Sequence, residues 1–525
     1  MCIFRLQGTT YKIGGYVRKE LSAMPINLGS YLSNRAMLNS DKEALVCEEV
    51  RLNWTELNGL SNQLGYAMKR LGVGYGDRVG LLALNEPEYL AMFYGLGKIG
   101  AILVPINYRI AGPEMEYILN NSGCKVFVFG PEYVDIVDTI RGNIGAQHFV
   151  ALMDTPPKWA SSYKALTGNE STEEPEHVGG DDDVLTLLYT SGTTGRPKGS
   201  MLTHRNFFIS ATNLISTLGD LGNTALMVLP LFHIGGLGTV PLATQLGSRS
   251  IMLKSLDPKR MLELIQEEKV NVFGSVPALL QILKMVPDFE KYDWSSVQKV
   301  FVYAAPLPVS LLEEYAEAGI EVLNLYGMTE TCGSGTVIDG EHAMLKAGSC
   351  GLPEFLAEVK VVNEKGNQVK PEERGEVIIK ADFVMKGYWN NPEATAESIK
   401  DGWLYTGDIA KCDKDGFFYI MDRKKDMIIS GGENIYPAEI EDLLLRHPKI
   451  QDVGVIGYPD KIWGEAVKAI VVVAPGESLT MEEVIEWTKG KIGKFKMPKS
   501  VVFTDALPRT PTGKILKKDL RAKYN

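Results

Sequence analysis

The chain has 525 residues, more than one hydrophobic core normally serves, so the sequence predicts at least two domains. Apolar residues make up 45% of the chain and charged residues 23%, which is ordinary for a soluble globular protein. The formal net charge of −10 argues against a nucleic-acid-binding protein, because contacts with phosphate backbones need a basic surface. The charge does not bear on small anionic ligands, which need positive charge only locally.

The cysteines and the apolar stretches indicate a compartment. Six cysteines are scattered without the spacing of a metal site, which predicts reduced thiols in a cytoplasmic protein. The most apolar long stretch, residues 89–108, is interrupted by Lys98 and contains three glycines, so no membrane span is expected. The first 24 residues are basic but lack the long apolar core and the cleavage site of a signal peptide. We predict an N-terminal extension at residues 1–26, with Met24 as an alternative start.

Between residues 27 and 130, helical and strand patterns alternate. Thr55 is expected to cap a helix whose apolar residues keep helical spacing as far as Leu71. A strand, a second helix and a second strand are expected next, at residues 79–84, 86–100 and 101–105. Alternation of this kind predicts a parallel sheet with helices on both faces. The polar segment 156–183 is expected to run over the surface.

The alternation resumes farther along the chain and later gives way to other patterns. It predicts a helix at residues 257–268 and strands at 225–229, 270–273, 300–304 and 321–325. Short, turn-rich segments between residues 357 and 420 predict a small β-barrel-like subdomain. The expected fold class is α/β: a large N-terminal domain (27–424) of parallel-rich sheets flanked by helices, then an α+β domain (425–525) that begins at Lys425.

A loop of glycines and hydroxyl residues at positions 190–199 follows the buried strand expected at residues 184–188. Its glycines let the backbone N–H groups approach an anion, and its hydroxyl groups are further donors. Arg196 and Lys198 add positive charge, so the loop is typical of one that binds polyphosphate. It is not a Walker A loop, because the order is Lys198-Gly199 rather than Gly-Lys before Ser or Thr.

Other candidate residues follow predicted strands, where ligands bind in sheets of this kind. Glu330, at the end of Tyr326-Gly327-Met328-Thr329-Glu330, suits Mg²⁺, although a solvated loop acid has the same pattern. The segment Tyr303 to Pro306 predicts a flat backbone shelf or a plain strand-to-helix turn. His233 lies in an apolar run, where a histidine is more often part of the core than catalytic.

These motifs, and their order along the chain, resemble those of the adenylate-forming enzymes. The family includes acyl-CoA synthetases, peptide-synthetase adenylation domains and firefly-type luciferases. The resemblance covers residues 27–525, and Gly431 to Pro437 look most like bacterial fatty-acid and related carboxylic acid–CoA ligases. It implies that the chain binds ATP, Mg²⁺ and CoA. The residues that it assigns to ATP or AMP are Thr190, Ser191, Gly192, Thr193, Thr194, Gly195, Lys198, Ala304, Ala305, Pro306, Asn324, Tyr326, Gly327, Asp408 and Arg423.

The resemblance also implies roles in the reaction. Glu330 is expected to hold Mg²⁺, Thr329 to contact the α-phosphate, and Lys514 to reach both the carboxylate and the α-phosphate. The residues assigned to catalysis are Lys514, Glu330, Thr329 and His233, with His233 positioning the substrate rather than acting as a base. Those assigned to the acyl pocket are His233, Tyr303, Gly333 and Ser334, those assigned to CoA are Ser430, Gly431 and Gly432, and Lys425 is the hinge of a mobile C-terminal domain.

The implied reaction has two steps. A carboxylate attacks the α-phosphate of ATP and releases pyrophosphate, and the CoA thiolate then attacks the acyl-adenylate. Tyr303 stands where the family commonly has glycine or another small residue, which favours a compact acid: short to medium in chain length, alicyclic or aromatic. The alternatives are an enzyme that loads a carrier protein, a luciferase-type oxygenase and a nucleotide-binding pseudoenzyme. A homodimer is the one assembly that we consider for the chain.

Overall fold

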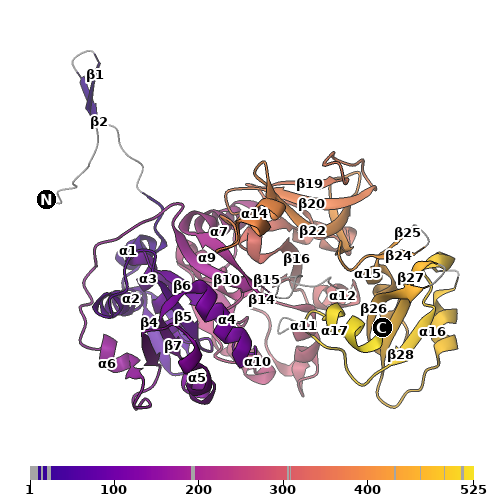
Figure 1. The fold of residues 1–525 in the computed structure, drawn as a ribbon, viewed down its shortest axis with the longest axis horizontal. Helices are drawn as coiled ribbons and strands as arrows, with labels where there is room; N and C mark the ends of the chain where they lie inside the picture. The colour runs from indigo at the N-terminus through magenta and orange to yellow at the C-terminus, as the bar shows by residue number, and fades with distance from the viewer. Residues whose placement is uncertain are drawn as a thin grey trace.

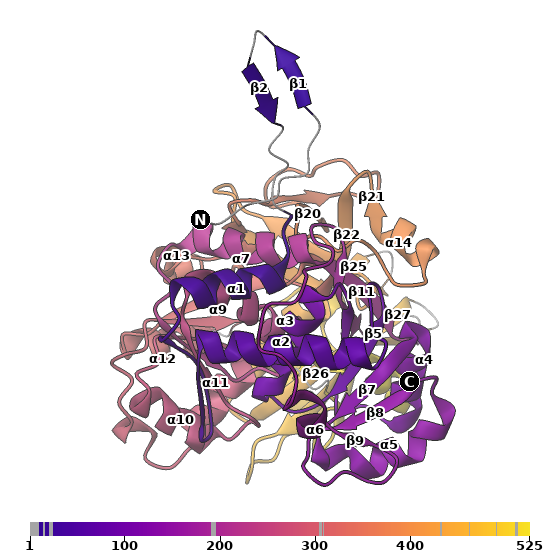
Figure 2. The same cartoon turned by 90° about the vertical axis from the view of Figure 1, so that its left-hand side faces the viewer.

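The computed structural model describes residues 10–13, 16–19, 25–190, 196–303, 307, 309–430, 433–460, 463–489, 491–509 and 513–525. Within the N-terminal extension, β1 (Thr10–Ile13) and β2 (Tyr16–Lys19) pair as an antiparallel hairpin. In both views this hairpin stands apart from the body of the protein (Figures 1 and 2).

The first large sheet has seven strands. They are β5 (Arg78–Leu82), β6 (Ile102–Pro105), β7 (Cys124–Phe129), β8 (His148–Ala151), β9 (Ser161–Ser162), β10 (Val184–Thr190) and β11 (Lys198–Thr203). The order is β11-β10-β6-β5-β7-β8-β9, and every pair is parallel except the hairpin of β10 and β11. Thr190 lies opposite Lys198 in that hairpin, so the two strands meet at the base of the predicted phosphate loop.

The second large sheet has nine strands. They are β3 (Glu43–Cys47), β4 (Val50–Asn53), β12 (Thr224–Met227), β13 (Arg249–Met252), β14 (Val272–Ser275), β15 (Lys299–Val302), β16 (Glu321–Gly327), β17 (Gly335–Val337) and β18 (Leu352–Pro353). Their order is β18-β17-β16-β15-β14-β12-β13-β3-β4, with parallel pairing from β16 to β3 and antiparallel edges. The strand β16 runs to Gly327, two residues beyond the predicted end.

Helices cover both faces of each large sheet. One core cluster joins the two sheets through α1 (Leu28–Leu38), α2 (Trp54–Arg70), α3 (Pro87–Lys98), α7 (His204–Leu218) and α9 (Thr239–Leu246). The outer faces carry α4 (Gly112–Ser122) and α5 (Val134–Ile140) on the first sheet, and α10 (Pro258–Glu267), α11 (Pro277–Lys284) and α12 (Val309–Glu317) on the second. Side chains of β7 alternate between two cores: Val126 and Val128 pack in the core between the two sheets, and Phe127 and Phe129 pack against the outer helices. The predicted fold class is therefore confirmed.

One predicted helix cap is wrong. The helix α2 begins at Trp54, and its N-cap is Asn53, whose side chain accepts a hydrogen bond from the Glu56 amide at 2.8 Å. The Glu56 carboxylate accepts one in return from the Asn53 amide, which completes a capping box. Thr55 lies inside the first turn, and its hydroxyl donates to the Ser40 carbonyl instead.

Two smaller units follow the large sheets. The β subdomain is antiparallel and contains β19 (Glu358–Val362), β20 (Arg374–Lys380), β21 (Ile399–Lys400), β22 (Trp403–Cys412) and β23 (Phe418–Arg423). The C-terminal unit contains β24 (Ile428–Ser430), β25 (Glu433–Ile435), β26 (Ile450–Asp460), β27 (Gly464–Val473) and β28 (Ser500–Phe503) with α15 (Pro437–Leu445), α16 (Met481–Thr488) and α17 (Lys517–Tyr524). It is the yellow unit in Figure 1. Shorter helices are α6 (Tyr163–Thr167), α8 (Ile234–Leu237), α13 (Gly340–Leu345) and α14 (Pro392–Ser398).

Buried Lys98 on α3 connects the polar surface segment 156–183 to α2 through hydrogen bonds. Lys98 is fully buried, and its ammonium donates to Asn58 and Asn62 at 2.6 Å and to Glu174 at 2.7 Å. Replacing Lys98 by methionine leaves these oxygens without their shared donor, so we expect a loss of about 2–3 kcal/mol in the free energy of unfolding. Denaturant unfolding measures this. The control is Arg70→Met, which removes the more exposed Arg70–Glu170 pair and should cost under about 1 kcal/mol. Equal losses would contradict the role of Lys98.

Candidate active site

A large cavity of about 2110 Å³ lies at the carboxyl ends of strands from both large sheets. Pro105, Thr190 and Gly327, the last residues of β6, β10 and β16, all line it. Ligands of open α/β sheets bind at this edge, since the loops that follow the strands converge there. The C-terminal unit supplies the remaining wall, through residues that include Arg509 and Lys514.

Glu330 lies in a short 3₁₀ helix, Thr329–Thr331, that follows β16. It is 6% exposed, and one of its carboxylate oxygens accepts a hydrogen bond from the Tyr388 hydroxyl at 2.8 Å. The Lys198 ammonium lies 5.2 Å from the centre of the Tyr388 ring. Tyr388 therefore lies between Glu330 and Lys198 and contacts both. No sequence motif around Tyr388 predicted this position.

The carboxylate of Glu330 suits a Mg²⁺ ion that is bound mainly through the phosphates of a nucleotide. Among the residues that the structure describes, no group of three or more His, Cys, Asp or Glu side chains could enclose a metal. Mg²⁺ keeps several waters and commonly binds one or two carboxylates together with substrate phosphates. A single carboxylate in the wall of a cavity suits an ion that is held mainly by a nucleotide.

Tyr326, Asp408 and Arg423 form a hydrogen-bonded group. Asp408 is 4% exposed; it accepts from the Tyr326 hydroxyl at 2.7 Å and pairs with the Arg423 guanidinium at 2.7 Å. Burial first, and then the charge of Asp408, raise the pKa of Tyr326 well above its usual value, so the phenol stays neutral. Arg423 lines the cavity, while Tyr326 and Asp408 support it from behind.

Asn324, predicted to bind the nucleotide, does not line the cavity. Its side-chain amide lies within β16 and donates to the Ser349 carbonyl at 3.1 Å, so it braces the neighbouring loop. Ser430, predicted to bind CoA, is buried at the end of β24 and also lies off the cavity. The predictions for Ser191 to Gly195, Ala304 to Pro306, Gly431 and Gly432 concern positions outside the described residues.

His233 lies at the start of α8 and lines the cavity. Its Nε2 atom is buried and has no hydrogen-bond partner among the described residues. Burial chiefly, with the charges of Arg109 and Lys514, lowers the pKa of His233 to about 4, so the imidazole is neutral at pH 7. An unpaired polar atom in a cavity wall indicates a ligand contact, because such atoms are costly to leave unsatisfied.

Lys514 projects into the same cavity from the C-terminal unit. Its side chain is open to the cavity, yet the surrounding protein desolvates the ammonium and thereby lowers its pKa. The nearby charges of Arg423 and Lys425 act in the same direction, whereas Asp408 and Glu330 oppose them. Residues separated by nearly two hundred positions thus meet in one electrostatic environment.

The three remaining acyl-pocket candidates also come together. Tyr303, Gly333 and Ser334 all line the cavity. The ring of Tyr303 packs against Gly274, where an added Cβ would lie only 2.8 Å from the ring. Ser334 hydrogen bonds through its hydroxyl to that of Ser210, at 2.8 Å.

Two polar cavity residues escaped the sequence analysis. Arg109 lines the cavity and acts on the charge state of His233. Asn85 accepts from the Leu231 amide at 3.0 Å and donates to the Leu229 and Leu253 carbonyls at 3.2 Å, so it fixes the loop that carries His233. Its position directly after a predicted strand was the available signal.

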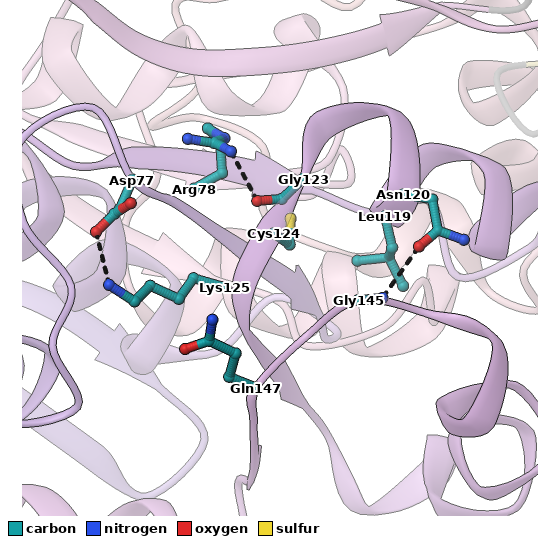
Figure 3. Close-up of a pocket in the computed structure, with 9 residues that line it drawn as sticks. All are labelled: Asp77, Arg78, Leu119, Asn120, Gly123, Cys124, Lys125, Gly145 and Gln147. Atoms are coloured by element: carbon teal, nitrogen blue, oxygen red, sulfur yellow. Dashed lines mark hydrogen bonds and ion pairs between the residues drawn. The ribbon is translucent and has the colours of Figure 1, made fainter.

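A second, smaller pocket of about 290 Å³ lies at the opposite ends of the strands, beside the first residues of β5 and β7 (Figure 3). Its charged groups are already engaged: Lys125 pairs with Asp77 at 3.1 Å, and Arg78 donates to the Gly123 carbonyl at 2.9 Å. The pocket therefore offers little to a ligand. Within the described chain, no helix is both long and apolar enough to cross a membrane.

Comparison with known proteins agrees with this geometry. The AMP-binding enzyme family matches residues 32–389, and the AMP-binding enzyme C-terminal domain matches residues 439–514. The chain is 39% identical over 504 residues to a long-chain-fatty-acid–CoA ligase of Mycobacterium tuberculosis, covering 95% of this chain and 99% of that one. It is 39% identical over 499 residues to a feruloyl-CoA synthase of Amycolatopsis sp., covering 95% and 99%.

A solved structure is similar over the same length. The o-succinylbenzoate–CoA synthetase of Bacillus subtilis, in complex with its acyl-adenylate intermediate, shares 31% identity and a TM-score of 0.84, covering 95% of this chain and 98% of that one. The fold and the cavity thus define an enzyme that activates acids with ATP, and the chain belongs to the AMP-binding enzyme family. It is an AMP-forming acid–thiol ligase that uses ATP, Mg²⁺ and CoA.

Proposed function

We propose that this enzyme joins a compact carboxylic acid, short to medium in chain length, alicyclic or aromatic, to CoA. One observation carries the proposal: Glu330, Arg423 and Lys514, from both parts of the chain, share one cavity with the candidate acyl pocket. The relatives act on acids as different as long-chain fatty acids and ferulate, by their names. The choice of acid therefore rests on the pocket of this chain. The unpaired thiols of five described cysteines support a cytoplasmic setting.

The first step forms an acyl-adenylate. A carboxylate oxygen attacks the α-phosphorus of ATP, the bond to the β-phosphate oxygen breaks, and pyrophosphate leaves. The negative charge that develops around the α-phosphate needs fixed positive groups. Lys514 and Arg423 supply them in the cavity, and Glu330 would hold the Mg²⁺ that binds the phosphates. Mg²⁺ would supply neutralising charge to the phosphates and the departing pyrophosphate.

The second step transfers the acyl group. The CoA thiolate attacks the acyl carbon, a carbon–sulfur bond forms, and AMP leaves. Arg109 and His233 both line the cavity, and the charge of Arg109 supports an approach for this anionic co-substrate there. Lys514 fills part of the cavity in the first step, so we propose that the C-terminal domain turns about Lys425 between the steps.

The direct test is a panel of acids assayed for pyrophosphate release with and without CoA. With compact acids, we expect the enzyme to release pyrophosphate from ATP. We expect it to form a thioester only when CoA is present. A phosphopantetheinylated carrier protein that replaces CoA as the better acceptor would favour the carrier-loading alternative. Light emission would favour an oxygenase. Absence of pyrophosphate release with every acid would favour a nucleotide-binding pseudoenzyme, against which Glu330, Asp408, Arg423 and Lys514 together argue.

Tyr303 gives a prediction about acid size. Its ring occupies cavity volume that a glycine would leave empty, so Tyr303→Gly should raise kcat/KM for longer acids relative to the native acid. We expect a change of about 1–3 kcal/mol in that ratio, or roughly tenfold or more. Measuring kcat/KM over a chain-length series for both proteins tests this. A wild type that already prefers long chains, or an unchanged profile in the variant, would show that Tyr303 does not limit the pocket.

A further inference from the structure

A short segment at residues 385–389 connects two of the motifs that meet at the cavity. The Met385 amide donates to the Glu330 carbonyl at 2.8 Å, and the Trp389 amide donates to the Gly199 carbonyl in β11 at 2.8 Å. The strand β11 leads away from the predicted phosphate loop, and Glu330 follows β16. The segment therefore joins the backbone of the candidate metal ligand to the strand beside the phosphate loop.

Tyr388 lies in this segment and is held on two sides. Its backbone pairs with that of Ser200 in β11, and its amide donates to the Thr395 hydroxyl at 2.8 Å. The residue is only 9% exposed, yet it lines the cavity. A buried side chain on a paired backbone has few rotamers open to it, so the fold sets the position of the Tyr388 hydroxyl before a ligand binds.

The Tyr388 hydroxyl orients the Glu330 carboxylate. It donates to one carboxylate oxygen at 2.8 Å. Among the residues that the structure describes, the other oxygen of Glu330 accepts no hydrogen bond. Carboxylates that bind a metal are commonly oriented by hydrogen bonds of this kind, and the loss of such a bond lowers metal affinity. The arrangement leaves the second oxygen of Glu330 as the available ligand atom.

The ring of Tyr388 keeps two opposite charges apart. The Lys198 ammonium lies 5.2 Å from the ring centre, close enough for a cation–π attraction. Glu330 and Lys198 each contact Tyr388, and within the described chain they form no ion pair with each other. A direct ion pair would neutralise both groups, whereas a neutral phenol between them leaves a carboxylate for a metal and an ammonium for a phosphate.

We propose that Tyr388 is a positioning residue for the metal and the phosphates of the nucleotide. Its hydroxyl directs Glu330 toward Mg²⁺, and its ring keeps Lys198 beside the phosphate loop. This inference rests on the proposed function, in which Glu330 would hold Mg²⁺. Tyr388 acts on the reaction through these two neighbours and not by contact with the reacting atoms.

The experiment measures metal binding rather than turnover. Mn²⁺ replaces Mg²⁺ because it is paramagnetic and prefers the same oxygen ligands. It is titrated into enzyme that is in excess over α,β-methylene-ATP, and electron paramagnetic resonance reports the free ion. Tyr388→Phe removes the hydroxyl and keeps the ring, so we expect Mn²⁺ to bind about tenfold more weakly. Calorimetry in EDTA should show unchanged binding of the nucleotide alone, because Lys198 keeps its contact with the ring.

Two further variants separate the ring from the hydroxyl and supply a control. Tyr388→Leu also removes the ring and should weaken metal-free nucleotide binding, by about two- to fivefold. The control is Tyr315→Phe, which removes a buried tyrosine hydroxyl that donates to the Leu280 carbonyl at 2.9 Å, away from the cavity. It should leave both affinities unchanged. Tyr388→Met, a second variant without a ring, replaces Tyr388→Leu if the latter does not fold.

Glu330→Gln distinguishes orientation of the carboxylate from general damage to the site. In protein that already carries Glu330→Gln, Tyr388→Phe should weaken Mn²⁺ binding no further, because the hydroxyl acts through the carboxylate. Additive losses, or unchanged Mn²⁺ affinity in Tyr388→Phe alone, would overturn the inference while pyrophosphate release still upheld the proposed function. Unchanged nucleotide affinity in the variant without a ring would overturn the role of the ring. Wild-type Mn²⁺ affinity in Glu330→Gln would overturn the proposed metal site, and the inference with it.

Discussion

Replacing Lys514 by alanine is expected to slow acyl-adenylate formation by about two to three decades, as for removal of one preorganised charged donor. The reason lies in the placement of Lys514, which projects into the cavity among Arg423, Asp408 and Glu330. Its side chain already lies in the cavity before charge develops on the α-phosphate, so we expect little reorganisation in the transition state. Thioester formation from pre-made acyl-adenylate should be spared, because the phosphate chemistry is then complete.

The two half-reactions are measured separately. Pyrophosphate release with acid and ATP reports the first, and consumption of synthetic acyl-adenylate with CoA reports the second. The matched control is Lys523→Ala, which removes an exposed lysine of the same C-terminal segment that does not line the cavity. Equal loss in both half-reactions would refute the assignment of Lys514 to adenylation.

Proline at position 425 is expected to have the opposite effect. Lys425 stands between β23 and β24, two residues after Arg423, whose carbonyl accepts from the Asp426 and Met427 amides. Proline fixes φ and removes an N–H group, so it should restrict rotation of the backbone there. We expect Lys425→Pro to retain adenylation and to lose about tenfold or more of thioester formation, because the proposed domain movement that admits CoA would be hindered.

Contacts between the two parts of the chain make this prediction specific. The Asp422 carboxylate, which precedes Lys425, accepts from the Ala438 amide at 2.9 Å and lies 3.8 Å from the Lys517 ammonium, both of which follow Lys425. These contacts hold the arrangement in which Lys514 enters the cavity, and the proposed rotation would have to break them. Lys425→Ala is the control and should keep both half-reactions. Wild-type rates of both in Lys425→Pro would locate the hinge elsewhere.

The sequence by itself determined the architecture and most of the motifs. Apolar runs such as Val79 to Leu82 become buried strands, since their residues supply two cores by alternation. Tyr303 and Glu330 reach one cavity because each follows a strand of the second large sheet with a parallel neighbour, and the carboxyl ends of such strands share one edge. Local competition was harder to judge: Asn53 and Thr55 can both cap a helix, and the reciprocal bond with Glu56 selects Asn53.

Only the tertiary structure decided which partner each polar group takes. Tyr326 bonds Asp408 across 82 positions, Tyr388 bonds Glu330 across 58, and Asn213 bonds Glu354 across 141. No sequence pattern near these residues predicts their hydrogen-bond partners, because the pairing depends on how strands from separate units pack. The same holds for Asn324, which the family resemblance assigned to the nucleotide and whose side-chain amide donates to the Ser349 carbonyl. Burial makes each of these polar groups find a partner, and the packing of distant segments determines which one it is.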